Sequence, residues 1–318
     1  MRILVTGGAG FIGSNIVEAL LKDPRVTRVR VLDNLATGSL ENMKAFLDDP
    51  RFTFMEGDIR DMDTCRRACE ETDRISHQAA LGSVPRSIND PITTNNVNIT
   101  GTLHMFTAAK EAGIKRVVYA ASSSTYGDHP GLPKVEDQTG NPLSPYAITK
   151  LVNELYARVY AQLFDMEFIG LRYFNIFGPR QNPNGPYAAV IPLFAEALLR
   201  GQPPTINGDG TNSRDFTYVS NAVQANILSL FTENKEALNQ VYNIACGEQT
   251  SLLELFNGLN KEAGTRLQPV FGPERLGDVK HSLADISKAR TLLGYEPDIT
   301  VEEGLKRTME WYRGRLRG

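Results

Sequence analysis

The chain opens with Arg2-Ile3-Leu4-Val5-Thr6-Gly7-Gly8-Ala9-Gly10-Phe11-Ile12-Gly13, an apolar run that leads into a glycine-rich turn. Residues 14–21 follow with apolar side chains at helical spacing. The glycines fit both G-x-G-x-x-G and the looser G-x-x-G-x-x-G, and they let the backbone approach a pyrophosphate at the N-terminus of the helix. The stretch predicts a dinucleotide-binding α/β fold, and a glycine-rich turn without a ligand is the alternative.

A carboxylate ends the next predicted strand. Asp33 follows residues 28–32 and stands twenty residues after Gly13, where an acid can accept hydrogen bonds from the adenosine ribose hydroxyls. The same acid would repel a 2′-phosphate, so we expect NAD rather than NADP. Further strands are predicted at 52–56, 75–80 and 116–121, which makes the first half a Rossmann-type doubly wound parallel sheet.

Several polar residues near these strands have two interpretations. Asp58 can reach the adenine amine, or it can cap a helix predicted at 61–71. Asn98, near the start of a helix predicted at about 95–112, can reach the cofactor or serve in capping and packing. His77 has no metal-ligand partner at a familiar spacing, so we interpret it as a packed histidine and expect no metal site.

A phenol and an ammonium lie four residues apart in Ser144-Pro145-Tyr146-Ala147-Ile148-Thr149-Lys150. Ser144 can cap a helix and Pro145 fits its first turn, so Tyr146 and Lys150 should share a face. A cation about 4 Å away at an effective dielectric of ~20 favours the phenolate by roughly 4 kcal/mol, which would lower the tyrosine pKa into the range of a general base. Taken alone, the pair would be better interpreted as an exposed Tyr and Lys on a solvated helix face.

A serine run follows the fifth predicted strand, in Ser122-Ser123-Ser124-Thr125-Tyr126-Gly127. A hydroxyl at the carboxyl end of a central parallel strand lies where α/β sheets place their chemistry. A serine-rich loop without chemistry is the alternative. The chain has no Gly-x-Ser-x-Gly elbow, which disfavours a Ser–His–acid hydrolase.

Taken together, these motifs and Arg172-Tyr173-Phe174-Asn175 resemble the extended short-chain dehydrogenase/reductase family of NAD-dependent nucleotide-sugar epimerases and dehydratases. The resemblance runs nearly end to end. It implies that Tyr146, Lys150 and Ser122 are catalytic. With the glycine loop and Asp33, the expected cofactor contacts are Gly7, Gly10, Phe11, Ile12, Gly13, Asp33, Asn34, Gly38, Asp58, Ile59, Gln78, Ala79, Ala80, Asn98, Tyr146, Lys150 and Tyr173.

The second half is expected to hold the substrate. Residues 177–186 are rich in turn formers and predict a crossover, so we expect an NAD-binding domain over 1–175 and a smaller C-terminal α/β nucleotide-sugar domain over 176–318, with segments near 214–245 able to return to the first sheet. By the resemblance, Arg214 and Arg275 grip the diphosphate and Asp278 the ribose; surface arginines in charged loops are the alternative. The implied substrate contacts are Ser83, Ser122, Ser123, Tyr146, Asn175, Ala189, Val190, Asn207, Arg214, Arg275, Asp278 and Ser282.

The resemblance also indicates the reaction. Related dehydratases and decarboxylases carry an acid before Tyr126, where this chain has only hydroxyls, so the implied cycle is oxidation at the sugar C4, rotation of the keto sugar and hydride return. Bacterial UDP-galactose epimerases of the family place a tyrosine where Ser282 stands, and serine leaves room for an N-acetyl group. The hypothesis is interconversion of UDP-N-acetylglucosamine and UDP-N-acetylgalactosamine. A UDP-glucose or UDP-glucuronate 4-epimerase, and a non-catalytic NAD-sensing regulator, are the alternatives.

Composition narrows the partners. The 318 residues are 41% hydrophobic and 22% charged, with a net charge of −3, which is typical of a globular protein and does not favour nucleic acid or an acidic membrane as a partner. Three cysteines, no signal peptide before Arg2 and no apolar run of membrane-spanning length predict a cytoplasmic protein. Family members commonly form homodimers through the helices that here span about 95–112 and 146–163; ordinary core packing by those helices is the alternative.

Overall fold

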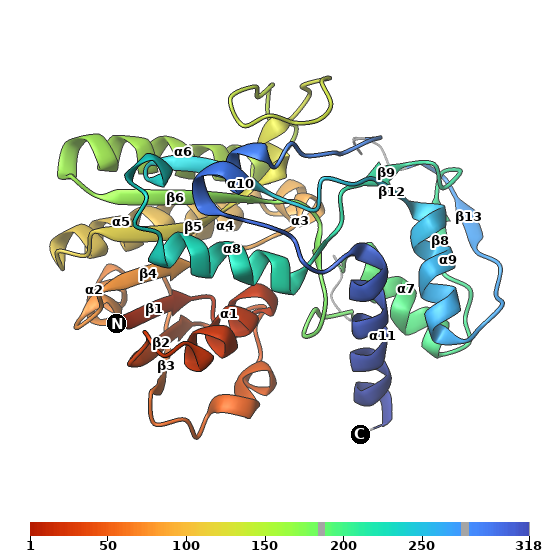
Figure 1. Ribbon diagram of the computed structural model, residues 1–318, viewed down its shortest axis with the longest axis horizontal. Helices are drawn as coiled ribbons and strands as arrows, with labels where there is room; N and C mark the ends of the chain where they lie inside the picture. Colours follow the sequence, from red (N-terminus) through yellow and green to blue (C-terminus); the bar gives the residue numbers. More distant parts are fainter. Residues whose placement is uncertain (184–187, 275–279, 318) are drawn as a thin grey trace.

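The computed structural model describes residues 1–183, 188–274 and 280–317, and its centre is a parallel sheet (Figure 1). The sheet has seven strands in the order β11-β6-β5-β4-β1-β2-β3. The order reverses between β1 and β4, which is the point where doubly wound sheets bind ligands. The predicted Rossmann-type fold is therefore confirmed. The strands are β1 (Arg2–Thr6), β2 (Arg28–Asp33), β3 (Phe52–Glu56), β4 (Arg74–His77), β5 (Arg116–Ser122), β6 (Glu167–Tyr173) and β11 (Gln240–Ile244).

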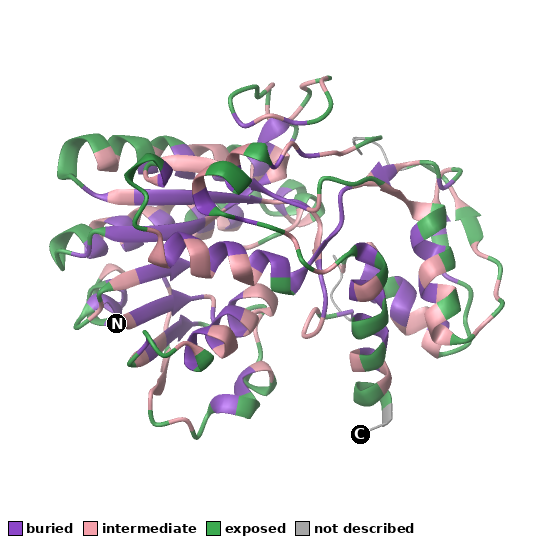
Figure 2. Cartoon of the chain, in the orientation of Figure 1, coloured by how far each residue is buried: buried purple, intermediate pink, exposed green. Residues whose placement is uncertain are grey.

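Helices cover both faces of the sheet, and a separate hydrophobic core lies under each layer. In β1, Ile3 and Val5 face one core and Leu4 faces the other, as the alternation of a strand requires. Figure 2 shows these central strands largely buried. One layer contains α1 (Phe11–Lys22), α8 (Val219–Phe231) and α10 (Ser287–Leu293); the other contains α2 (Met62–Cys69), α5 (Thr102–Glu111) and α6 (Pro145–Phe164).

A smaller group of elements packs around a third core, built on Phe177, Phe194 and Phe256. Its helices lie at the right of Figure 1. In the described ranges, three two-stranded sheets accompany them. The elements are α7 (Val190–Leu199), α9 (Leu252–Ala263), α11 (Val301–Arg317), β7 (Ile176–Phe177), β8 (Thr205–Asn207), β9 (Ser213–Arg214), β10 (Thr217–Tyr218), β12 (Thr250–Ser251) and β13 (Val270–Gly272).

The chain crosses between these two groups more than once. After β10 it returns to the large sheet through α8, and β11 pairs with β6 in parallel register, Gln240 opposite Ile169 and Ile244 opposite Tyr173. The segments near 214–245 thus contribute a helix and an edge strand to the first sheet. A domain boundary at residue 175 stays a prediction.

Two predicted elements differ from the observed ones. The strand predicted to end at Ala80 ends at His77, because Ala79 N donates to Thr6 Oγ1, at 3.2 Å, instead of to a strand carbonyl. The helix predicted from about 95 to 112 begins with a π-helical turn, η2 (Asn96–Gly101), before α5. This turn follows the short helices α3 (Val84–Asn89) and α4 (Pro91–Asn95). No helix in the described part of the chain has the length and apolar character needed to cross a membrane.

Candidate active site

The glycine loop lies at the switch point, between β1 and the N-terminus of α1. Gly7 has φ +70°, and a Cβ there would lie 2.7 Å from the backbone nitrogen of Ala79. A Cβ on Gly13 would lie 2.1 Å from the carbonyl oxygen of Gly7. Gly10 is the N-cap of α1, where a Cβ would meet only one atom, 3.1 Å away. The backbone around Gly7 and Gly13 is thus tightly packed, while Gly10, at the N-terminus of α1, has little in contact with it. This arrangement fits a pyrophosphate bound at the helix N-terminus.

Asp33, at the end of β2, anchors this loop. Its two carboxylate oxygens accept hydrogen bonds from Ala9 N, at 2.9 Å, and Leu35 N, at 2.8 Å. Burial raises the pKa of the carboxyl above its ordinary value, and the two backbone bonds act against that rise. Each oxygen keeps a lone pair for a further donor. The position and chemistry fit an adenosine ribose.

Asp58 follows β3 and faces Asn34, whose Nδ2 donates to its carboxylate at 2.8 Å. The guanidinium of Arg60 holds the pKa of Asp58 down at about 2. The N-cap of α2 is Asp61, not Asp58, so the capping alternative for Asp58 is wrong. Asn34 and Asp58 therefore form a polar rim beside Asp33.

The loop after β4 contains Gln78 in a closed hydrogen-bond network. Tyr173 at the end of β6 donates its hydroxyl to Gln78 Oε1, at 3.0 Å, and accepts from Asn226 Nδ2, at 2.7 Å. Gln78 Nε2 donates back to Asn226 Oδ1, at 3.0 Å. Asn226 of α8 was not predicted; its signal in the sequence is an amide side chain within a largely apolar helix.

Two other polar residues near this loop form hydrogen bonds within the protein interior. Asn98 exchanges two hydrogen bonds with the backbone of Leu81, at 2.8 and 3.1 Å, and donates to Thr149 Oγ1 at 3.1 Å. The imidazole of His77 lies between the hydroxyls of Thr6 and Thr102, and burial lowers its pKa to about 3. The predicted packed histidine is confirmed. The described residues contain no group of three His, Cys, Asp or Glu that could hold a metal ion.

Tyr146 and Lys150 lie at the start of α6. Ser144 caps the helix, its hydroxyl accepting from Ala147 N at 3.1 Å. Lys150 Nζ donates to the carbonyl of Ala120 in β5, at 2.8 Å, and lies 5.9 Å from the centre of the Tyr146 ring. The lysine is 3% exposed. The pair therefore faces the sheet, and the solvated-face alternative is wrong.

The electrostatics of the pair differ from the prediction. Burial raises the pKa of Tyr146, and a hydrogen bond with Ser122 lowers it by less. Burial also lowers the pKa of Lys150 to about 8. The predicted depression of the tyrosine pKa by Lys150 is thus not observed, because desolvation of the phenolate dominates and the ammonium is directed at Ala120.

Ser122 ends β5 and begins the turn η3 (Ser123–Tyr126). Its hydroxyl accepts from Ser124 N, at 3.1 Å, and from Ser124 Oγ, at 2.9 Å. With the bond to Tyr146, this hydroxyl joins the turn to α6. The three predicted catalytic side chains therefore lie together at the carboxyl end of β5.

The remaining predicted cofactor contacts border the same region. Phe11 and Ile12 form the first turn of α1, Gly38 packs against Ala9, and Ile59 follows Asp58. Ala79 and Ala80 follow Gln78 in the loop after β4, beneath the glycine loop.

The described part of the chain places the predicted substrate residues on elements of both groups. Asn175 follows β6, and its Nδ2 donates to the carbonyl of Asp215 at 3.0 Å. Ser282 N donates to the carbonyl of Ser213 at 3.1 Å, which places Ser282 beside Arg214 of β9. Ser83 caps α3 with φ +138°. Ala189 caps α7, Val190 begins it, Asn207 ends β8 and Ser123 begins η3; Arg275 and Asp278 lie outside the described residues.

Asp215 is the organising residue that the sequence did not reveal. It is fully buried, and its carboxylate accepts from the backbone nitrogens of Cys246 and Gly247, both at 3.0 Å, and of Ala284, at 3.2 Å. Burial raises its pKa to about 7. One side chain thus joins β9, the end of β11 and the segment that carries Ser282. Its only signal was its position directly after Arg214.

Comparisons with known proteins agree with this geometry. The family model described as the NAD dependent epimerase/dehydratase family matches residues 3–245. A UDP-glucose 4-epimerase of Mycolicibacterium smegmatis is 38% identical, with 99% of both chains covered.

Two solved structures share the whole fold. The UDP-glucose 4-epimerase of Thermotoga maritima, solved with UDP-glucose, superposes with a TM-score of 0.93 at 36% identity over 99% of this chain and 100% of that one. The UDP-N-acetylglucosamine 4-epimerase of Methanobrevibacter ruminantium, in complex with UDP-N-acetylmuramic acid, gives 0.92 at 40% identity over 99% and 98%. The family match, the full-length relatives and the site together show that this chain belongs to the NAD-dependent epimerase/dehydratase family.

Proposed function

We propose that this protein interconverts UDP-N-acetylglucosamine and UDP-N-acetylgalactosamine. Its family and relatives make it an NAD-dependent UDP-sugar 4-epimerase. The observation that carries the proposal is the convergence of Tyr146, Lys150 and Ser122 at the carboxyl end of β5, together with the small residue Ser282, whose backbone is hydrogen-bonded to Ser213, the neighbour of Arg214. UDP-glucose and UDP-glucuronate are the competing substrates.

The residues of the chain have distinct roles in this reaction. The α1 N-terminus and the glycine loop would hold the pyrophosphate of NAD, and Asp33 the adenosine ribose. Bound NAD supplies a hydride acceptor and then a hydride donor at the sugar C4. In its phenolate form, Tyr146 takes the proton of the 4-hydroxyl, with the Ser122 hydroxyl between them, and returns it after the keto sugar has rotated. Burial disfavours this form, so the phenol must release its own proton before the first step. Lys150 supplies a buried positive charge beside the phenol.

The turn after β5 supports epimerisation over elimination of water. Residues 122–126 contain only hydroxyl side chains, and those of Ser122 and Ser124 are hydrogen-bonded to each other at 2.9 Å. A dehydration needs an acid or base at the neighbouring carbon, and this turn provides none. The simple C4 oxidation and reduction cycle is what its groups can perform.

Ser282→Tyr is expected to exclude the acetylated sugars. The ring would occupy space beside the C2 substituent, so kcat/KM for UDP-N-acetylglucosamine should fall about 10–100-fold relative to UDP-glucose. Turnover of each UDP-sugar, with the products resolved by chromatography, measures this ratio. Ser282→Ala, which keeps the space open, should retain the wild-type preference. An unchanged preference in Ser282→Tyr would remove the argument for N-acetyl substrates.

We also propose a homodimer that pairs α6 with its copy. Leu155, Val159 and Leu163 recur at four-residue spacing on α6 and are 48%, 45% and 68% exposed. Ile88 of α3 and Ile92 of α4, whose helices pack beside α6, are also exposed. A contiguous apolar face of this kind is typical of an interface.

Leu155→Lys is expected to shift the protein toward monomer, because it would bury a charge at the interface. Sedimentation velocity over a range of concentrations measures the change. Phe271→Lys, at an exposed position on β13, is the matched control and should leave the oligomeric state unchanged. A wild-type monomer at all concentrations would contradict the proposal.

A further inference from the structure

A buried ion pair lies behind the catalytic residues. Arg172 Nε and Nη2 donate to the two carboxylate oxygens of Glu154, at 2.9 and 2.8 Å. The two side chains are 4% and 6% exposed. Removing two charges from water costs free energy that their attraction barely recovers, so a buried pair is weak evidence of a role in stability. Another role must be considered.

Glu154 is one helical turn after Lys150, on the same face of α6. The titratable groups that face the Lys150 ammonium are Tyr146 and Glu154 from its own helix and His77 from β4. Tyr146 and His77 are neutral, because burial raises the pKa of the first and lowers that of the second. Among the described residues, Glu154 is therefore the negative charge that acts on Lys150.

Arg172 of β6 connects this carboxylate to the serine turn. Its Nη1 donates to the carbonyl of Glu136, at 2.9 Å, and its guanidinium lies 4.8 Å from the centre of the Tyr126 ring. Tyr126 closes the turn that begins at Ser122, and its hydroxyl donates to Asn243 of β11 at 2.6 Å. One guanidinium thus contacts both elements that carry the catalytic side chains.

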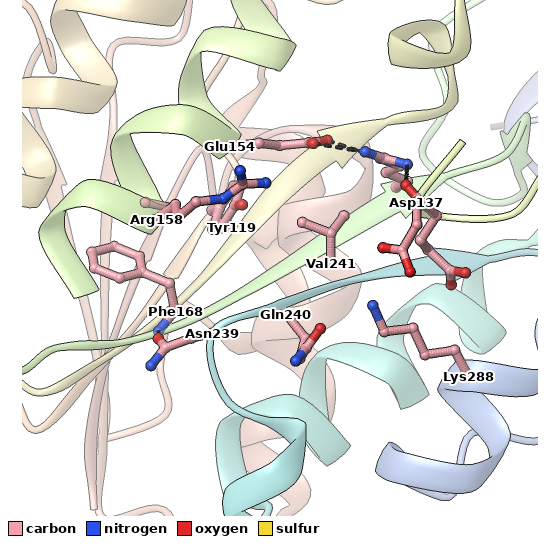
Figure 3. A pocket seen from close by; sticks show the side chains of 12 residues that line it. Tyr119, Asp137, Glu154, Arg158, Phe168, Asn239, Gln240, Val241 and Lys288 are labelled. Carbon is pink, nitrogen blue, oxygen red and sulfur yellow. Dashed lines mark hydrogen bonds and ion pairs between the residues drawn. The ribbon is translucent and has the colours of Figure 1, made fainter. Parts of the chain in front are cut away.

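The pair also forms part of the wall of a pocket of about 110 Å³ between α6, β6 and β11 (Figure 3). The dashed line from Glu154 in that view marks the ion pair, and the side chains of Arg158 and Lys288 come from α6 and α10 on either side. The pair therefore lines this pocket, and Glu154 lies on the helix that also carries Lys150.

We propose that Glu154 and Arg172 are positioning residues of the epimerase site. Glu154 keeps the Lys150 side chain charged and oriented. Arg172 fixes the position of Glu154 relative to the serine turn. The role assigned to Lys150 rests on the proposed function. No contact of either residue with substrate or cofactor is implied.

The direction of the effect follows from the charges. Burial lowers the pKa of Lys150 to about 8, and the charge of Glu154 opposes that decrease. If the carboxylate is neutralised, the pKa should fall further, and Lys150 should lose its proton closer to neutral pH. Arg172, left without its partner, would add to this effect because its charge has the same sign as that of the lysine.

Glu154→Gln tests this without changing the size of the side chain. In NAD-loaded protein with 13C-labelled lysine, the Lys150 resonance is assigned by its loss in Lys150→Met, and its titration midpoint is followed by NMR. The midpoint should fall by about 1 pH unit or more, as expected for loss of a neighbouring opposite charge. The alkaline limb of the pH–rate profile for epimerisation should move to lower pH by the same amount.

Glu167→Gln is the matched control. Glu167 also pairs with an arginine, Arg116 of β5, at 2.7 Å, but it lies at the opposite end of β6. Its replacement should leave the Lys150 midpoint unchanged. If Glu154→Gln does not fold, the double variant Glu154→Gln/Arg172→Met removes both charges together, which proteins tolerate better. In this double variant the Lys150 midpoint should lie below that of the wild type but above that of Glu154→Gln, because the like charge of Arg172 is removed as well.

A wild-type midpoint in either folded variant, or an equal decrease in Glu167→Gln, would overturn the positioning role. The two proposals can fail separately. Wild-type protein that turns over no UDP-sugar would disprove the proposed function, while the NMR midpoints would still decide whether Glu154 acts on Lys150.

Discussion

Tyr146→Phe is expected to reduce kcat for UDP-sugar epimerisation by about 10²–10⁴-fold, the usual contribution of a positioned acid–base group. The phenol lies at the start of α6, hydrogen-bonded to Ser122 and near the Lys150 ammonium. Loss of the hydroxyl removes the proton acceptor for the sugar 4-hydroxyl and leaves the ring in place. Product analysis by chromatography gives the rate, and the NAD released on denaturation gives the cofactor content, which should stay at the wild-type level.

Tyr160→Phe is the control on the same helix. The Tyr160 hydroxyl lies 2.9 Å from Thr107 Oγ1, between α6 and α5, at the other end of the helix from the site. Its loss should affect stability slightly and turnover little. Full activity in Tyr146→Phe, or an equal loss in Tyr160→Phe, would remove Tyr146 from the mechanism.

Gly13→Ala should remove most of the bound NAD. A Cβ at this position would lie 2.1 Å from the Gly7 carbonyl oxygen and 2.9 Å from the Gly8 Cα. Both are backbone atoms, so no side-chain rotation relieves the contact and the loop itself must move. Overpacking of this kind costs about 1–3 kcal/mol, or roughly 10–100-fold in NAD affinity. The ratio of NAD to protein after gel filtration, and calorimetric titration, measure the change.

Gly314→Ala provides the comparison for Gly13→Ala. Gly314 lies in α11, where a Cβ would meet no atom within 4 Å. Alanine there should increase the free energy of unfolding by up to about 1 kcal/mol through helix propensity, with NAD content unchanged. If Gly13→Ala retained NAD at the wild-type level, the glycine loop would not be the binding site of the pyrophosphate.

Local patterns in the sequence were sufficient to predict the parallel sheet and the catalytic helix. The run from Arg2 to Gly13 contains its own strand, turn and helix signals, and the observed loop follows them. Tyr146 and Lys150 are four residues apart on one helix, so their shared direction follows from helix geometry. Features of this kind depend on neighbours in the sequence and are therefore predictable.

Features that depend on distant residues were not predictable. Asp215 accepts hydrogen bonds from residues about thirty and seventy positions further along the chain. The network of Asn226 likewise joins α8 to β6 and the loop after β4. The pKa of Tyr146 was predicted in the wrong direction because residue spacing gives the distance to a charge but not the loss of water around the phenol.

The position of β11 at the sheet edge also affects how the protein is made. Its partner β6 leaves the ribosome first, and β11 follows only after the smaller group of elements has begun to emerge. At roughly 5–20 residues per second, this interval lasts several seconds, during which the β6 backbone has an unpaired edge. The nascent chain is therefore most exposed to aggregation in that interval, and a pause in translation between the two strands would lengthen it.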